Sequence, residues 1–202
     1  LGVTSVLITV PFNSLFNLQT GYSNVAIGSN TLLYNTSNFN TAVGNYALLN
    51  NSSGSNNIGI GNYALLNNTT GSGNTAVGHN AGTFIAGGLS ANTFSEYSVF
   101  IGSSTKANTV GETNQIVIGY NATGLGSNTI VLGNSSITIT RLQGHVGIGT
   151  DVPTSPLTIQ SDGDSTTVVD IQGDAGQLLL LTDTTTGDIL TVGDVLSTPI
   201  FV

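Results

Sequence analysis

The sequence predicts an all-β protein whose main part is a parallel β-roll, or β-solenoid, of about seven coils. Three observations favour this fold. A short motif ending in Gly recurs seven times, uncharged Asn, Ser and Thr replace charged residues along most of the chain, and short aliphatic segments alternate with turn residues. A period of 17 residues is too short for a pair of helices, so it fits one coil with two short strands and two turns.

The first segment, residues 1–20, opens with an apolar stretch that has neither the positive leader nor the cleavage site of a signal peptide. We therefore expect a strand and an attachment segment here. No apolar run in the chain approaches the roughly 18 residues that cross a bilayer, so membrane insertion is not expected.

Residues 21–133 form the predicted repeat domain. Residues 45–61 and 62–78 are the clearest repeats, with 11 of 17 positions identical. The closing glycines of the seven motifs are Gly28, Gly44, Gly61, Gly78, Gly102, Gly119 and Gly133. Such a Gly fits a turn with positive φ or a backbone too crowded for a Cβ.

Two neighbouring columns of the motif predict which side chains point inward. We interpret the aliphatic residue before each Gly as the core ladder, which comprises Ile27, Val43, Ile60, Val77, Ile101, Ile118 and Leu132. The residue before it then faces outward, because side chains alternate along a strand. Small residues in this column, Ala26, Ala42, Gly59 and Ala76, would let another chain approach closely, so we predict a contact between chains there.

The remainder of each coil predicts a second strand and a turn. We expect the second strand at Leu32–Leu33, Ala47–Leu49 and Ala64–Leu66, followed by turns rich in Asn, Ser and Gly. Because stacked coils place Asn above Asn, we also expect ladders of Asn side chains.

The coil between Gly78 and Gly102 is seven residues longer than its neighbours and holds the candidate receptor contacts, Phe84, Phe94 and Tyr97. Loops that bulge from a rigid scaffold often bind partners, and aromatic side chains are frequent binding anchors. The alternative is that Phe84, Phe94 and Phe100 fill the interior where the register changes.

The last segment, residues 134–202, is an acidic, β-rich module. Residues 1–95 contain no Lys, Arg, Asp or Glu, whereas eight Asp residues follow position 150. This change in composition predicts a domain boundary near residues 134–150.

The repeats resemble the heads of trimeric autotransporter adhesins, whose Asn/Ser-x-Ala-Ile/Val-Gly motifs build a left-handed parallel β-roll of three chains. The long form in residues 62–82 also resembles repeats of bacteriophage tail fibres, and His145–Ile159 resembles a junction common in phage fibres. The resemblance implies a homotrimeric left-handed β-roll, followed by a C-terminal module whose three chains intertwine.

Composition excludes several kinds of chemistry. Two basic residues, Lys106 and Arg141, stand against ten acidic ones, giving a net charge of −8, so binding to nucleic acid is not expected. With no Cys, thiol catalysis and zinc-thiolate sites are excluded. The Gly-rich run 146–150 lacks the Lys-Ser/Thr and the βαβ context of a phosphate-binding loop.

No catalytic residue, cofactor or metal site is predicted. His79 and His145 have no neighbouring ligand set, and Asp162–Asp164 contains only a fragment of a calcium loop. Two weaker alternatives stay open. His145 of three copies could meet on a three-fold axis, and the C-terminal Asp residues could hold an ion between chains.

The expected function is structural and adhesive. The chain is expected to be a fibre segment of a phage virion that projects a receptor-binding tip and adds weak multivalent contacts to the host surface. Its expected partners are its own copies, other fibre, baseplate or capsid proteins, and a host glycan or protein. The alternative is the head of a bacterial trimeric cell-surface adhesin, and a fibre-borne polysaccharide depolymerase is less favoured because no cleft motif is recognisable.

Overall fold

The computed structural model describes residues 6–8 and 21–159. Within these residues there are fourteen strands and no helix. The chain divides into two compact units, residues 1–139 and 140–202, and the division lies six residues beyond the predicted end of the repeat domain. The second unit includes one parallel pair of strands, β13 (Val146–Ile148) and β14 (Leu157–Ile159).

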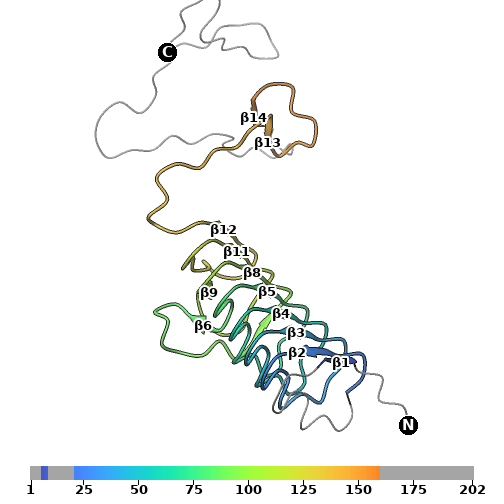
Figure 1. Ribbon diagram of the computed structural model, residues 1–202. Coiled ribbons are helices and arrows are strands. Elements are labelled where there is room, and N and C mark those ends of the chain that lie inside the picture. Colours follow the sequence, from blue (N-terminus) through green and yellow to red (C-terminus); the bar gives the residue numbers. More distant parts are fainter. Residues whose placement is uncertain (1–5, 9–20, 160–202) are drawn as a thin grey trace, which may run out of the picture. The chain divides into compact units, whose positions relative to one another are not determined.

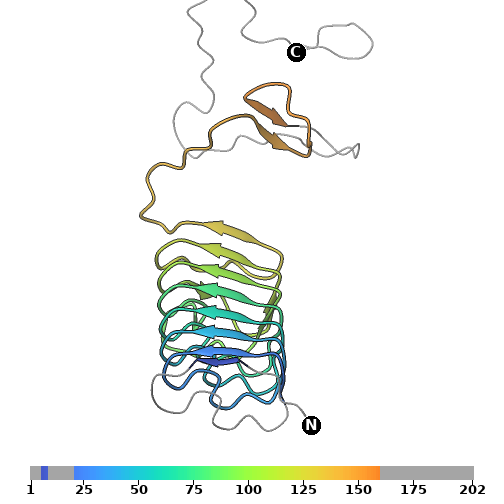
Figure 2. The ribbon, with the colours of Figure 1, turned by 45° about the vertical axis from the view of Figure 1, so that its right-hand side comes forward.

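Unit 1 contains an eight-stranded parallel sheet whose strands stack as successive rungs (Figures 1 and 2). In order they are β1 (Val6–Ile8), β2 (Val25–Ile27), β3 (Thr41–Val43), β4 (Ile58–Ile60), β5 (Thr75–Val77), β8 (Val99–Ile101), β11 (Ile116–Ile118) and β12 (Ile130–Leu132). Two further parallel pairs join β6 (Phe84–Ile85) to β9 (Lys106–Ala107), and β7 (Ser95–Glu96) to β10 (Glu112–Thr113). The unit is a β-solenoid in which each coil adds one strand to the large sheet.

The repeat alignment is also the spatial register of the sheet. Ala26 pairs with Ala42, which pairs with Gly59, and the same column continues to Val131 without a slip. The prediction of seven stacked coils is therefore confirmed for residues 21–133, and β1 adds one more strand at the end of the sheet.

The interior of the solenoid is narrow. The middle residue of each three-residue strand points into it, and Ala26, Ala42, Ala76, Phe100 and Val117 are completely buried. Leu32, Leu48 and Leu65 enter from the other side of the coil and are also fully buried. A Cβ on Gly59 would lie only 3.2 Å from Leu48 Cγ, so the space between the two walls admits few atoms.

The glycine that ends each motif is required by the stacking of backbones. Gly28 has φ of +125°, and a Cβ there would lie 2.6 Å from the carbonyl oxygen of Gly44 in the next coil. Gly61 has the same relation to Gly78. The expectation of positive φ and a crowded backbone is confirmed at these positions.

The predicted second strand is wrong in the first three coils. Residues 29–34, 45–50 and 62–67 form turns, in which Leu32, Leu48 and Leu65 have φ near +50°. Successive turns still hydrogen-bond to one another, for example from Leu48 N to Ala64 O at 2.9 Å. An extended strand cannot contain a left-handed residue, and this conformation lets each Leu side chain turn inward.

Asn side chains form the predicted ladders inside the turns. In one ladder the backbone N of each Asn donates to the side-chain Oδ1 of the Asn one coil earlier. The distance is 2.9 Å both from Asn40 N to Asn24 Oδ1 and from Asn57 N to Asn40 Oδ1. In the second, Asn51 Nδ2 donates to Asn35 Oδ1 at 2.9 Å and Asn68 Nδ2 donates to Asn51 Oδ1 at 3.0 Å. These residues are buried, so the ladders satisfy most of the polar atoms that would otherwise destabilise the interior, although Asn68 Oδ1 has no hydrogen-bond partner.

The seven-residue insertion is a small hairpin that leaves the sheet intact. Ile85 N donates to Ser90 O at 3.0 Å, and Phe84 forms an antiparallel bridge with Ala91. Thr75 of β5 still pairs directly with Val99 of β8. The insertion therefore leaves the solenoid as a side loop and does not interrupt its register.

Candidate functional site

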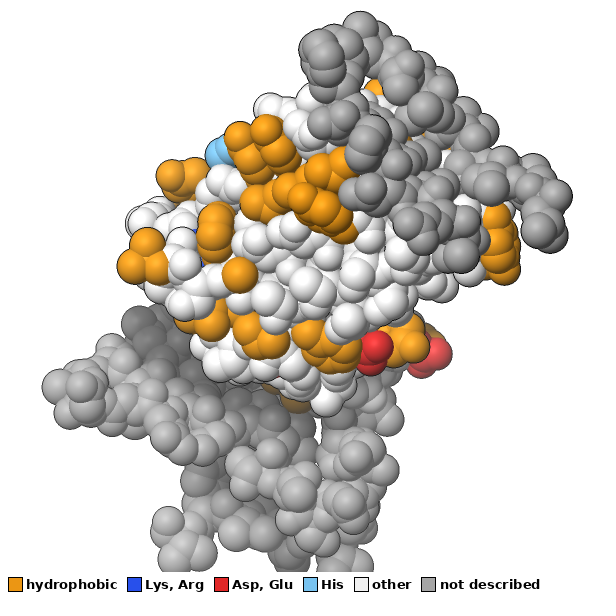
Figure 3. Space-filling model, turned by 90° about the horizontal axis from the view of Figure 1, so that it is seen from below, with side chains coloured by type: hydrophobic (Ala, Val, Ile, Leu, Met, Phe, Trp, Pro, Cys, Tyr) orange, Lys and Arg blue, Asp and Glu red, His pale blue; other side chains and the backbone are white. Residues whose placement is uncertain are grey.

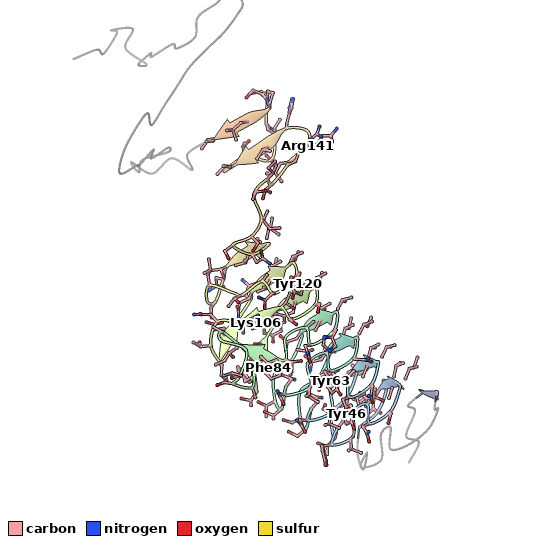
Figure 4. All side chains as sticks on the ribbon, turned by 60° about the vertical axis from the view of Figure 1, so that its left-hand side comes forward. Tyr46, Tyr63, Phe84, Lys106, Tyr120 and Arg141 are labelled. Atoms are coloured by element: carbon pink, nitrogen blue, oxygen red, sulfur yellow. The ribbon has the colours of Figure 1, made fainter. Side chains whose placement is uncertain are left out.

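The outward side of the large sheet is a continuous apolar surface, which we call the aliphatic face. It consists of the first and third residues of seven successive strands, namely Val25, Ile27, Thr41, Val43, Ile58, Ile60, Thr75, Val77, Val99, Ile101, Ile116, Ile118, Ile130 and Leu132. All fourteen are aliphatic or Thr, and each lies directly beside its counterpart in the next strand. Figure 4 shows these side chains projecting from the stacked strands on the side away from the coil interior.

The predicted orientation of the two motif columns is reversed. The proposed core ladder, Ile27, Val43, Ile60, Val77, Ile101, Ile118 and Leu132, lies on the aliphatic face; Ile60 is 40% exposed and Leu132 is 57% exposed. The proposed chain-contact column of Ala26, Ala42, Gly59 and Ala76 lies in the interior. Leu48 and its equivalents occupy the space opposite, so only small side chains fit inside and the larger aliphatic ones must point outward.

The aliphatic face carries no charge. None of its residues is ionisable, and the chain has no Lys, Arg, Asp or Glu before Glu96. The described surface seen in Figure 3 is mostly uncharged, with separate groups of hydrophobic side chains and acidic side chains at one edge. Large contiguous apolar surfaces are uncommon on monomeric soluble proteins, so the aliphatic face is the candidate interaction surface of the described residues.

The candidate receptor contacts are not gathered into one cluster. Phe84 lies on β6 and is half-buried, as is Phe94, whereas Tyr97 is 67% exposed and its ring lies against Gly73. None of the ring contacts among the described residues joins these three side chains. The tip of the hairpin presents Leu89, which is 93% exposed. Receptor contact by Phe84, Phe94 and Tyr97 stays a prediction.

The interpretation of the long coil as an interior plug applies to Phe100. Phe100 is fully buried in a column that Ala fills in three earlier coils, and Gly82 stands opposite it in the column that Leu fills elsewhere. A Cβ on Gly82 would lie 2.8 Å from Phe100 Cδ2. The large ring thus occupies the volume that a missing Leu side chain leaves.

An aromatic row was not predicted from the sequence. Tyr46 and Tyr63 stack with ring centroids 5.3 Å apart and planes 4° apart, and His79 meets Tyr63 edge-on at 6.1 Å. The repeat alignment could have predicted it, because Tyr46 and Tyr63 occupy the same position in the two most similar repeats. The row lies in the turns that follow β3, β4 and β5, so it stacks in the same register as the strands.

Two polar side chains enter the interior of the later coils. Glu112 accepts hydrogen bonds from Asn108 N at 3.0 Å and from Thr109 Oγ1 at 3.1 Å. Lys106 donates from Nζ to Ser104 O at 3.1 Å and to Asn121 Oδ1. Burial lowers the pKa of the Lys106 ammonium below its usual value, because the charged form loses hydration. Figure 4 labels Lys106 among the side chains of these coils.

The last coil leaves a cavity of about 570 Å³ at its open end. It is lined by Asn121, Thr123, Leu125, Val131, Gly133, Asn134, Ser135 and Ser136. Val131 belongs to the inward column but is only half-buried here, because no further coil covers it. The cavity is the uncovered end of the solenoid core and has no ionisable lining residue.

No metal centre is formed by the described residues. They include no group of three or more His, Asp or Glu side chains that could hold an ion. His145 Nδ1 lies 3.2 Å from Pro153 O, and Asp162–Asp164 falls outside the described residues. The described residues also include no helix able to span a membrane.

Comparison with protein-family models, with curated proteins and with solved structures gave no match for the chain.

Proposed function

We propose that the chain is a segment of a homotrimeric phage fibre, in which three copies pack their aliphatic faces around a common axis as a left-handed β-roll. The observation that carries the proposal is the uncharged aliphatic face, which spans seven rungs of one sheet. Strands about 4.8 Å apart give a face nearly 30 Å long. Burial of this surface between copies releases its hydration water and stabilises the assembly.

The narrow interior supports the same proposal. A usual domain buries its large aliphatic side chains inside, but here Ala and Gly fill much of the interior and Ile and Val lie outside. Three flat faces can cover one another around an axis, so the core that one chain lacks is supplied by its copies. The number three follows from the resemblance of the repeats to trimeric adhesin heads and phage fibres.

The strand pair of unit 2 also supports association between chains. β13 and β14 form a two-stranded sheet in which Ile148 is 54% exposed and Leu157 is 57% exposed. Such a pair is marginally stable at best on its own in water, so further strands are needed to cover it. Strands from other copies would supply them in an intertwined C-terminal module.

The function we propose is mechanical and adhesive. The rigid stack of coils sets the spacing within a virion fibre, joins other fibre, baseplate or capsid proteins, and presents its loops to the host surface in three copies. Neutral, Asn-rich and Thr-rich loops suit contacts with a glycan or protein that do not depend on charge.

Charged substitutions on the aliphatic face test this proposal. The double variant Ile60→Asp, Val77→Asp of the full chain is expected to be monomeric by multi-angle light scattering, whereas the unchanged chain is expected to be trimeric. An aspartate buried between chains without a partner costs several kcal/mol, and three copies would bring six of them together. Each coil should still fold, because both side chains point outward.

The matched control is Ser53→Asp, Asn56→Asp, which adds the same charge at two exposed turn positions. This variant is expected to remain trimeric. A monomeric unchanged chain, or a trimer that survives both face substitutions, would contradict the proposal. Attachment of the intact assembly to a bacterial outer membrane rather than to a virion would favour the cell-surface adhesin.

A further inference from the structure

Lys106 occupies an unusual place for the only lysine of the chain. It stands four residues after a motif glycine, the position that Leu32, Leu48 and Leu65 fill in earlier coils. Like them it enters the interior, and 9% of it is exposed. A side chain that serves only solubility would not be placed in a core column.

The hairpin of the long coil helps to cover this lysine. A Cβ on Gly88 would lie 4.0 Å from Lys106 Cδ, and Ala86 N donates to Asn108 O, next to β9, at 3.3 Å. The aliphatic stem therefore lies beside the same insertion that distinguishes this coil. Its terminal nitrogen is directed at the next coil, where Asn121 lies.

The contacts of Nζ are neutral. It donates to Ser104 O at 3.1 Å and to Asn121 Oδ1, and no carboxylate among the described residues forms an ion pair with it. Glu112, the buried acid nearest in sequence, is held by Asn108 N and Thr109 Oγ1. A partly buried ammonium without a counter-ion loses hydration that no carboxylate replaces, and the lowered pKa of Lys106 increases the fraction of free amine, which is the nucleophilic form.

We propose that Lys106 and Asn121 form an intramolecular amide cross-link. The Lys106 Nζ lone pair attacks Asn121 Cγ, after the ammonium has lost one proton to water. The Cγ–Nδ2 bond breaks, the leaving nitrogen takes the second Nζ proton, and ammonia departs. One C–N bond forms and one breaks, so no oxidant, reductant or cofactor is required.

The surroundings suit this reaction. The contact from Nζ to Oδ1 brings the amine to the carboxamide. Backbone hydrogen bonds from Lys106 N to Ala122 O at 2.9 Å and from Gly124 N to Lys106 O at 2.8 Å hold the two coils side by side. Asn121 is itself exposed, so ammonia can leave into solvent. The product is a neutral amide, which removes the partly buried and unpaired charge of Lys106.

The cross-link would join two stacked coils near the open end of the solenoid. Lys106 follows Gly102 and Asn121 follows Gly119, and Asn121 also lines the end cavity. A covalent bond between rungs would prevent the last coils from separating under load. The inference does not depend on the trimer, because both residues belong to one chain.

The composition of the chain gives a direct test. Lys106 and Arg141 are the only residues after which trypsin can cut. Because trypsin does not cut after a lysine whose amine is acylated, the denatured full chain is expected to be cut after Arg141 alone. Its intact mass is expected to be lower than the sequence mass by one ammonia. Fragmentation of the tryptic peptide should show residues 106 and 121 joined.

Variants separate the cross-link from other losses of ammonia. Asn121→Ser restores the full mass and the cut after Lys106, and Ser is tolerated there because Ser104 has the same positive φ one coil earlier. The matched control is Asn80→Ser, because Asn80 occupies the position equivalent to Asn121 two coils earlier. This variant is expected to keep the cross-link, so trypsin should not cut it after Lys106. A full-mass unchanged chain that is cut after Lys106 overturns the proposal. Loss of ammonia with normal cutting after Lys106 also overturns it, because this result indicates a succinimide.

Discussion

At the scale of single residues, buried carboxamides hold the turns of the solenoid together. Asn51 Nδ2 donates to Gly54 O at 2.7 Å and to Asn35 Oδ1 at 2.9 Å, and its Oδ1 accepts from Asn68. One side chain thus closes its own turn and connects it to the turns on both sides. Gln115 shows the contrast, since it is fully buried and its amide atoms have no hydrogen-bond partner.

We predict that Asn51→Ala lowers the free energy of unfolding of the full chain by about 2–3 kcal/mol, because it removes the four hydrogen bonds of the side chain and leaves a small void. Denaturant unfolding followed by circular dichroism measures the change. Ser53→Ala, an exposed position of the same turn, is the control and should change stability little. Equal effects of the two substitutions would show that the Asn ladder contributes no stability.

At the scale of coils, stability depends on complementary volumes across the narrow interior. Phe100 is large where earlier coils have Ala, and Gly82 is small where earlier coils have Leu. The backbone is left-handed at both positions of the second column, with φ of +50° at Leu65 and +66° at Gly82. The same backbone therefore accepts either arrangement, provided that the two walls change together.

A double-mutant cycle should detect this coupling. We predict that Phe100→Ala alone costs about 3–5 kcal/mol and Gly82→Leu alone about 1–3 kcal/mol, through a cavity and through overpacking respectively. The double variant restores the arrangement of the earlier coils and should be more stable than Phe100→Ala. Thermal unfolding of the four proteins gives the coupling, and additive losses would disprove it.

The sequence predicted the repeat, the parallel register and the Asn ladders, because Gly and Asn recur wherever the backbone requires them. It did not predict which way the strands face. Alternation along β3 allows either Ala42 or its neighbours Thr41 and Val43 to point inward, and the choice depends on Leu48 opposite. The second strand was predicted wrongly because Leu48 reads as a strand residue, although its φ of +51° places it in a turn.

The candidate site was predicted less well than the fold. A chain-contact surface was expected on the large sheet, but on the column that the structure places inside. The choice between columns required the thickness of the coil, which depends on contacts between walls and not on the pattern of any one strand. The Tyr46–Tyr63 row was overlooked because stacking follows from the register between coils.

At the scale of the whole molecule, the proposed assembly joins neutral surfaces. The aliphatic face has no ionisable residue, while most acidic residues follow position 150. Association through the face should therefore depend on the hydrophobic effect and not on ion pairs.

We predict that the trimer persists at both low and high salt. At about 1 M salt the Debye length falls to about 3 Å, so pairs of exposed charges would be screened, whereas apolar contacts would not weaken. Sedimentation equilibrium at about 0.05 M and about 1 M sodium chloride measures the mass of the assembly. Dissociation at the higher concentration would show that ion pairs, and not the aliphatic face, hold the copies together.

The uniform register makes the length of unit 1 adjustable in fixed steps. Residues 45–61 form one complete turn of the chain, and the next turn starts with the same seven residues, Asn-Tyr-Ala-Leu-Leu-Asn-Asn. Removing one such turn would join Gly44 to Asn62, and β3 could meet β5 with inward Ala facing inward Ala. Duplication or deletion of a single repeat would thus lengthen or shorten unit 1 by one strand spacing, about 4.8 Å, and the side chains inside the remaining coils would still pack in the same columns. The number of coils therefore sets the length of unit 1.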